Sequence, residues 1–352
     1  MVAYFSRLAN KAKKREKPMK KVFIFGAGQI PLHAASYLLS SQAEGEAEVF
    51  MYSPHNAKRV EGALEDLNDT AFMRGFSSGW KFRATDDVED LKDADFAFFC
   101  AGKFPKPHEY DEAAKKGIDD RLLQAVQNIS IMESFCDQVL RSSPNVKIFV
   151  ITNPVDLMSD IAREKLPSNE VYGLGCYLDT CRFKRELHSM PEVIAAQADP
   201  AKTKAWIVGH HTGTMFLNRA GFFIDNAEKI KEIEAVIAKA LDKTRKRGLE
   251  ITKLNEAASD KRLNNGAYFA PSVMLAKVMT SCCSGEELVL PLNRPLVRED
   301  ELPFTGTAQL LASVKNGKVT PLSLPFNDGD TENLKISMEG QKKARLLLNL
   351  KA

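Results

Sequence analysis

The chain has 352 residues, a formal net charge of +3 at pH 7 and 44% hydrophobic residues. A chain of this length exceeds most single domains, so we expect one large domain or two closely joined ones. Its apolar and charged fractions are ordinary for a soluble globular protein. No apolar run approaches the roughly 18 residues of a membrane span, so we expect neither membrane insertion nor a membrane partner.

The excess positive charge lies at the start of the chain, in a basic arm that we assign to residues 1–19. Residues 11–21 hold seven lysines and arginines and one acid, Glu16. Such a segment suits a nucleic-acid-binding arm, a cleaved targeting peptide or a solvated, partly helical arm. We favour the last, because the segment lacks the apolar stretch of a signal peptide and only its charge supports nucleic-acid binding.

The six cysteines stand at positions 100, 136, 176, 181, 282 and 283. They show no CxxC spacing and no framework of a disulfide scaffold, so we predict no metal site. A reducing compartment suits such thiols, and we therefore expect a cytoplasmic protein.

The first strand–turn–helix unit has the context of a dinucleotide-binding turn. A strand-like run, residues 22–25, breaks at Gly26-Ala27-Gly28 and is followed by a helix-like segment, residues 32–39. Gly28 would let a pyrophosphate approach the backbone and the helix N-terminus. Pro31 replaces the third glycine of the fingerprint, and any tight strand-to-helix turn also uses glycines. We predict cofactor contacts at Gly26, Gly28, Gln29 and Ile30.

The end of the second predicted strand, residues 48–52, bears on the choice of cofactor. An NAD-binding fold usually presents an acid there to the ribose 2′-hydroxyl, whereas this chain has Ser53. Without an acid a 2′-phosphate is not repelled, and the nearby Lys58 and Arg59 offer donors. This favours NADP slightly over NAD. Lys58 and Arg59 suit the exposed surface of the next helix nearly as well.

A further strand-like run, residues 95–100, ends in Ala101 and Gly102, which we add to the cofactor contacts. The segment that follows, residues 103–120, holds two prolines and little apolar material, as expected of a mobile surface loop. It leads to Arg121 at the start of a helical pattern. An arginine on a hinged loop could close over a bound anion and polarise its carbonyl.

Residues 149–183 carry the strongest signal of chemistry. A buried-strand run stops at Asn153, and ligands of open α/β sheets gather at such strand ends. A second apolar run, residues 171–178, leads to Asp179 and Arg182, which are three positions apart and would share one face of a helix. An arginine fork can bind a carboxylate, and a buried aspartate can hold an imidazole. A structural ion pair with an asparagine cap is the competing interpretation.

Six segments, in chain order, resemble the lactate and malate dehydrogenase family, and the resemblance runs from about residue 20 to near the C-terminus. It implies an α/β fold, with a Rossmann doubly wound parallel sheet over residues 20–173 and an α+β catalytic domain over residues 174–352. It also implies hydride transfer between NAD or NADP and a small 2-oxo or 2-hydroxy acid, in a homodimer or tetramer. The segments are GAGQI, DLKDADFAFFCAG, Arg121 seven residues before Asn128, TNPVD, GLGCYLDTCRF and GHHTGTM.

The resemblance assigns roles to the matching positions. Arg121 would polarise the substrate carbonyl, Asn153 would orient the substrate beside the cofactor, and Arg182 would bind the substrate carboxylate. Asp179 would be the partner of the catalytic histidine, His211. A histidine side chain can pass a proton to and from an alcohol oxygen near neutral pH.

The chain departs from the family around His211 and in the loop. The GExHG-like surroundings of the histidine are here GHHTG, so a neighbouring acid and a following glycine are missing. We expect His210 to be replaceable. The position that usually selects the substrate falls on Pro105, with Lys106 next, and Lys106 could pair with a second carboxylate. The enlarged loop resembles that of some lactate dehydrogenases.

The sequence around Ala267 favours malate as the substrate. Ala267 is small and leaves room for a larger acid, and the Tyr-Phe-Ala-Pro that follows resembles the malate branch more than the lactate branch. We therefore predict malate (oxaloacetate) over lactate (pyruvate). The alternative is a catalytically impaired nucleotide-binding or regulatory relative of the same fold.

The remaining patterns predict the elements of the second half. Apolar periodicity indicates an amphipathic helix over residues 226–249 and another helix over 271–280. Alternating runs at residues 288–292 and 319–324 indicate antiparallel strands, and residues 334–348 a closing helix.

Overall fold

The computed structural model describes residues 19–41, 43–73, 78–103, 120–211, 213–256 and 267–350, together with residues 109, 112 and 115. Most of the basic arm and of the predicted loop therefore lies outside the described residues. So does Lys106.

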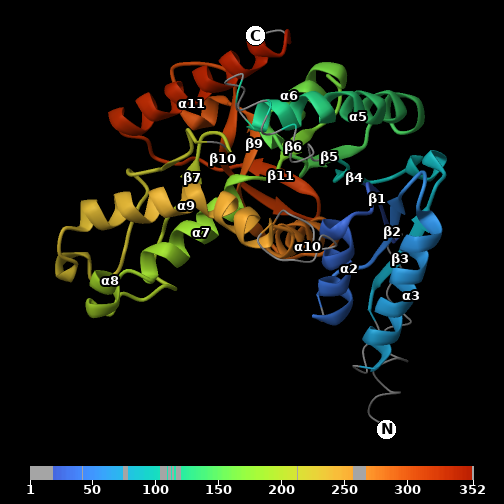
Figure 1. Cartoon of the computed structure of the whole chain (residues 1–352), viewed down its shortest axis with the longest axis horizontal. Coiled ribbons are helices and arrows are strands. Elements are labelled where there is room, and N and C mark those ends of the chain that lie inside the picture. The colour runs from blue at the N-terminus through green and yellow to red at the C-terminus, as the bar shows by residue number, and fades with distance from the viewer. Residues whose placement is uncertain are drawn as a thin grey trace.

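The strands of the first half form a parallel sheet with the spatial order β3-β2-β1-β4-β5-β6 (Figure 1). This is the order of a doubly wound dinucleotide-binding sheet, in which the crevice for the ligand opens where the order reverses, between β1 and β4. The predicted fold class is confirmed. The strands are β1 (Lys20–Phe25), β2 (Ala47–Tyr52), β3 (Trp80–Thr85), β4 (Phe96–Phe99), β5 (Lys147–Val150) and β6 (Val171–Gly173).

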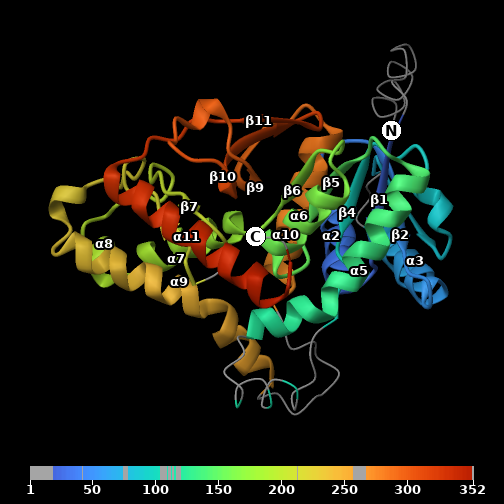
Figure 2. The same ribbon diagram turned by 90° about the horizontal axis from the view of Figure 1, so that it is seen from above.

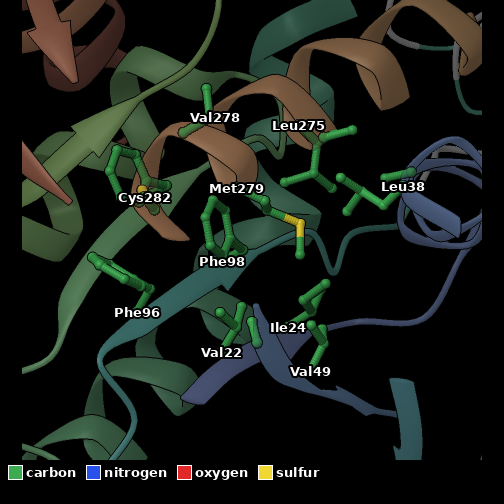
Figure 3. Close-up of a cluster of buried hydrophobic side chains, with 14 of the residues drawn as sticks. Val22, Ile24, Leu38, Val49, Phe96, Phe98, Leu275, Val278, Met279 and Cys282 are labelled. Carbon is green, nitrogen blue, oxygen red and sulfur yellow. The ribbon is translucent and has the colours of Figure 1, made fainter. Parts of the chain in front are cut away.

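Helices cover both faces of this sheet because its strands are apolar on both sides. On β1, Val22 and Ile24 pack toward one face, and Phe23 and Phe25 toward the other. Figure 3 shows the first of these cores, with strand residues facing Leu38 and Met279. The first face is covered by α2 (Gln29–Ser40), α3 (Ala57–Met73) and α10 (Phe269–Cys283), and the second by α5 (Asp120–Ser142) and α6 (Val155–Lys165).

The second half extends the same sheet. Strand β9 joins β6 in antiparallel fashion at a single residue pair, Gly173 with Asn293. A Cβ on Gly173 would lie 2.9 Å from the Cβ of Asn293 and 2.5 Å from the Oγ of Ser159, so glycine permits this close approach. The added strands are β9 (Leu288–Pro295), β10 (Thr307–Lys315) and β11 (Lys318–Pro321).

The rest of the second half forms a lobe beside the sheet, at the left of both ribbon views (Figures 1 and 2). Helices α7 and α9 lie side by side in this lobe and share a core with residues of β7. Closing helix α11 packs against β10 and α6. The elements are α7 (Cys176–His188), α8 (Pro191–Ala195), β7 (Ile207–Val208), β8 (Phe216–Leu217), α9 (Ile233–Glu256) and α11 (Asp328–Leu347).

Several predicted boundaries in the second half were wrong, including the start of α11, which is Asp328 rather than residue 334. Helix α9 begins at Ile233 rather than at residue 226, because Asn226 and Glu232 both have positive φ angles and interrupt the helical path. Helix α10 begins at Phe269, two residues before the predicted start, because Pro271 is tolerated in a first turn.

The state of the cysteines and the length of the helices relate to the expectations about disulfides and membrane insertion. All six cysteines lie among the described residues, and none of them forms a disulfide. Burial raises the pKa of the Cys136 thiol to about 12, which keeps it protonated at neutral pH. No helix in the described ranges is both long and apolar enough to cross a membrane.

Candidate active site

His211 and Asp179 form a close hydrogen-bonded pair. Asp179 lies in the first turn of α7 and is 1% exposed, and His211 follows the short strand β7. The imidazole Nδ1 lies 2.5 Å from Oδ2 of Asp179. When Nδ1 donates to this carboxylate, Nε2 is the ring atom that can take or give a proton. The predicted pairing of the two residues is therefore present in the structure.

Arg182 stands one helical turn after Asp179, on the same face of α7. Its Nη1 lies 3.5 Å from Oδ1 of Asp179, and its side chain is 14% exposed. One carboxylate thus contacts the imidazole with one oxygen and lies near the guanidinium with the other. The pair of oxygens fixes the imidazole and the guanidinium relative to each other.

Gly175 lets the start of α7 approach His211, and Gly248 lies near Arg182. A Cβ on Gly175 would lie 2.7 Å from Cβ of His211, so the start of α7 can contact the histidine only through glycine. A Cβ on Gly248, in α9, would lie 3.9 Å from Nη1 of Arg182. Helix α9 therefore borders the guanidinium.

Asp156 contacts His211 from a different element and was not among the predicted site residues. It lies in the first turn of α6 and is 2% exposed, and its Oδ2 accepts a hydrogen bond of 2.6 Å from the backbone N–H of His211. An acid three residues after Asn153, between the apolar Val155 and Leu157, was the signal in the sequence. It lay inside the TNPVD segment, where only Asn153 was given a role.

Asn153 is exposed at the end of β5, which is the edge of the sheet where the other predicted residues lie. Its backbone carbonyl accepts a hydrogen bond of 3.0 Å from Nδ2 of the buried Asn128. The Oδ1 of Asn128 accepts from the backbone N–H of Lys103 at 2.7 Å. Asn128 therefore ties the β5 end to the segment that follows Gly102, a role that sequence reasoning did not give it.

Arg121 lies in the first turn of α5, two turns before Asn128 on the same helix. The helix therefore leads from the Asn153 segment toward Arg121, but the side chain of Arg121 is not among those described. The predicted role of Arg121 stays a prediction, as does that of Lys106.

The glycine turn fits a bound dinucleotide. Gly26 has a φ of 110°, and a Cβ there would lie 2.6 Å from the backbone N of Ala101, so β1 and β4 approach through glycine. Gly28 has open space around its Cβ position and begins α2, whose first turn has no acid and no side-chain cap. Gln29 and Ile30 are the first residues of that turn. These features suit a pyrophosphate at the helix N-terminus.

The residues that would surround the adenosine ribose carry charges of both signs. Ser53 donates its backbone N–H to the carbonyl of Thr85 at 2.8 Å, which places the ends of β2 and β3 side by side. Lys58 and Arg59 are exposed in the first turn of α3. Burial raises the pKa of Tyr52, and nearby Asp86 and Asp87 raise it further. The two acids oppose the attraction of a 2′-phosphate to the basic side chains and were missed from the sequence.

His210, the residue before His211, is buried. Its exposed fraction is 1%. Its backbone N–H donates a hydrogen bond of 2.9 Å to Oγ of Ser337, and its Nδ1 lies 3.0 Å from the same oxygen. The expectation that His210 is replaceable stays a prediction; the backbone N–H of His210 and Oγ1 of Thr214 would still contact the Ser337 hydroxyl after the imidazole is removed.

A doubly wound sheet with a glycine turn at its switch point, and an aspartate-held imidazole at the same edge, is typical of nicotinamide-dependent dehydrogenases. Comparison with known proteins narrows this class. Residues 20–173 match the family model described as lactate/malate dehydrogenase, NAD binding domain. Residues 20–173 therefore form a dinucleotide-binding domain of the lactate/malate dehydrogenase type, and the protein is an oxidoreductase.

Some relatives of the chain are named lactate dehydrogenase and others malate dehydrogenase. The chain is 27% identical over 325 residues to the L-lactate dehydrogenase of Lactobacillus delbrueckii subsp. bulgaricus, covering 90% of this chain and 95% of the relative. It is 26% identical over 335 residues to the malate dehydrogenase of Francisella tularensis subsp. novicida, covering 92% and 95%.

A solved structure shows the same fold. The lactate dehydrogenase of Cryptosporidium parvum, complexed with lactic acid and nicotinamide adenine dinucleotide, superimposes with a TM-score of 0.78 at 19% identity. The match covers 96% of this chain and 100% of that one.

Proposed function

We propose that the protein is an NAD(H)-dependent malate dehydrogenase, which interconverts malate and oxaloacetate. The observation that carries the proposal is the fixed arrangement in which Asp179 lies between the imidazole of His211 and the guanidinium of Arg182. A 2-hydroxy acid needs both groups. One exchanges the hydroxyl proton, and the other binds the adjacent carboxylate.

Each side chain has a separate task in this reaction. Arg182 binds the substrate carboxylate through its planar fork and so turns the 2-carbon toward the cofactor. His211 Nε2 takes the hydroxyl proton during oxidation and returns it during reduction, while the Asp179 carboxylate stabilises the imidazolium that forms. Asn153 orients the substrate beside the cofactor. When bound, the nicotinamide ring accepts or supplies the hydride.

Two features of the second half support a dicarboxylic substrate. Ala267 lies two residues before α10, and the residue between them, Tyr268, stacks on His33 of α2 with ring centroids 5.0 Å apart, which anchors Ala267. Arg247 adjoins Gly248, which borders Arg182. The Nε of Arg247 is buried without a hydrogen-bond partner among the described residues, and its Nη1 lies 3.5 Å from Glu250. We infer that Arg247, next in the chain to Gly248, supplies a second guanidinium for a second carboxylate.

The substrate proposal predicts a higher kcat/KM for oxaloacetate than for pyruvate when NADH absorbance is followed. Arg247→Gln should lower the value for oxaloacetate about tenfold, the size expected for a lost charge-assisted hydrogen bond, and leave the pyruvate value within about twofold. Lys243→Gln, one turn earlier on α9 and paired with Glu186, serves as the matched control. A wild-type preference for pyruvate would contradict the proposal.

The competing function is a nucleotide-binding relative that has lost turnover. The missing acid and glycine around His211 favour it. It predicts that NADH binds, as measured by fluorescence, but that no 2-oxo acid is reduced. Turnover of either oxaloacetate or pyruvate would exclude it.

For the cofactor, we infer NAD(H) with residual tolerance of NADP(H). Asp86 and Asp87 beside the β2 end support NAD, whereas the hydroxyl of Ser53 does not repel a 2′-phosphate as an acid would. Ser53→Asp should therefore raise the ratio of NADH to NADPH kcat/KM about tenfold, through charge repulsion of the 2′-phosphate. An unchanged ratio, with the oxaloacetate KM also unchanged, would reject a ribose contact at residue 53.

Two further proposals concern the cellular location and the oligomeric state of the protein. The six cysteines, none of which forms a disulfide, support a reducing, cytoplasmic location. A homodimer or tetramer is supported by the family resemblance, and light scattering of the purified protein would test it.

A further inference from the structure

Asp156 is a buried carboxylate whose hydrogen bonds come from uncharged donors. Its Oδ2 accepts from the backbone N–H of His211 at 2.6 Å. Its Oδ1 accepts from Nδ2 of Asn293 at 2.7 Å and from Nε2 of Gln309 at 2.8 Å. A buried charge that is fully hydrogen-bonded holds its partners in fixed positions, because each donor would lose a strong bond by moving.

Gln309 extends this arrangement to the start of α7. Its Oε1 accepts from the backbone N–H of Cys176 at 3.2 Å, so its Nε2 is oriented toward Asp156. Its backbone N–H and carbonyl also pair with Gly209, at 2.6 and 3.2 Å. The side chains of Gln309 and Asn293 are fully buried. One glutamine therefore connects Asp156, the helix that carries Asp179 and the segment that carries His211.

Two carboxylates thus hold His211 at two different points. Asp179 binds the ring through Nδ1, and Asp156 binds the main chain of the same residue. Asp156 also begins α6, whose N-terminal dipole stabilises its negative charge. Arg163, on the same helix, is the charged group that Asp156 influences, and its guanidinium is already bonded to Asp160.

Resting on the proposed function, we propose that Asp156 is a positioning residue for the reaction. It fixes the backbone of His211 so that Nε2 meets the substrate oxygen, and it contacts neither the substrate nor the cofactor. A displacement of the imidazole by a fraction of an ångström would slow proton transfer without weakening carboxylate binding at Arg182.

Asp156→Asn tests this role because the amide cannot satisfy all three donors. One of its two polar atoms becomes an NH₂ group that must face either the N–H of His211 or the amides of Asn293 and Gln309. Asn293 can turn its Oδ1, which has no hydrogen-bond partner among the described residues, toward this NH₂ group. Gln309 can present its own Oε1 to the NH₂ group only by breaking its hydrogen bond with the backbone N–H of Cys176. The kcat of oxaloacetate reduction should fall about tenfold, while the oxaloacetate KM and the Kd of NADH change less than twofold.

Asp160→Asn is the matched control. Asp160 lies one turn later on α6, is also buried, and accepts from Arg163, Thr307 and Gln341 at 2.8, 2.9 and 3.1 Å. Its replacement should lower the thermal unfolding midpoint comparably, yet leave kcat within twofold at a temperature where both variants are folded.

The kcat values of the two variants decide whether Asp156 positions His211. A selective loss of kcat in Asp156→Asn supports the positioning role. An unchanged kcat, or an equal kcat loss in both variants, overturns it. If Asp156→Asn does not fold, Gln309→Leu removes one donor to Oδ1 and should lower kcat about threefold at constant KM, and an unchanged kcat there also overturns the role. An inactive wild type would instead reject the proposed function.

Discussion

Replacement of His211 by asparagine is expected to lower the kcat of oxaloacetate reduction by roughly a hundredfold or more, the usual size of an acid–base contribution. Asparagine can still donate to Asp179, so the polar contact at Nδ1 has a substitute. It has no atom that can carry the proton that Nε2 exchanges with the substrate oxygen. The Kd of NADH, measured by fluorescence, should be unchanged because the glycine turn is not altered.

His188→Asn provides a control for this result. His188 is the last residue of α7, the helix that carries Asp179, and its Nε2 lies 2.9 Å from Oγ1 of Thr203. Its replacement should leave kcat within about twofold of the wild-type value. A His211→Asn variant that is folded and retains the wild-type kcat would remove His211 from the mechanism.

Replacement of Arg182 by lysine should raise the oxaloacetate KM about tenfold or more while the affinity for NADH holds. Lysine keeps the positive charge but lacks the planar fork that binds both oxygens of a carboxylate. The ammonium would also relax the geometry beside Asp179, which lies 3.5 Å from Nη1 in the wild type. Steady-state kinetics with varied oxaloacetate would measure the change.

Arg185→Lys is the matched control on the same helix. The side chain of Arg185 is 63% exposed and its Nη2 lies 3.5 Å from the adjacent Glu186, so lysine should change neither KM nor kcat. An equal loss of substrate and cofactor affinity in Arg182→Lys would indicate misfolding rather than a lost carboxylate contact.

The sequence predicted the parts of the site that depend on short segments. The run before Asn153 becomes β5, and Asp179 and Arg182 share a helix face because they are three residues apart. Glycines 26 and 28 mark the strand-to-helix turn, and both have the space or the φ angle that such a turn requires. In each case the determining contacts lie within one local segment.

Contacts between distant segments were not predicted. Asp156 acquires its role only because β9 and β10 place Asn293 and Gln309, more than 130 residues later in the chain, against α6. Strand β10 itself was missed, since its buried run resembles a buried helical segment as much as a strand. A single sequence does not reveal such pairings.

The lean toward NADP did not take strand β3 into account, because the pairing of β2 with β3 is also a contact between distant segments. The lean toward NADP used Ser53, Lys58 and Arg59, all within one segment. Strand β3, which was not predicted, ends beside Ser53 and brings Asp86 and Asp87 to the same edge. The charge balance at the ribose depends on both strands.

A crystal structure of the protein with NADH and oxamate, an unreactive 2-oxo acid analogue, tests the central claim most directly. We expect the oxamate carboxylate within hydrogen-bond distance of the Arg182 guanidinium and its carbonyl oxygen within hydrogen-bond distance of His211 Nε2, beside a dinucleotide on the Gly26–Gly28 turn. Oxamate bound away from both side chains, with the dinucleotide in place, would contradict the account.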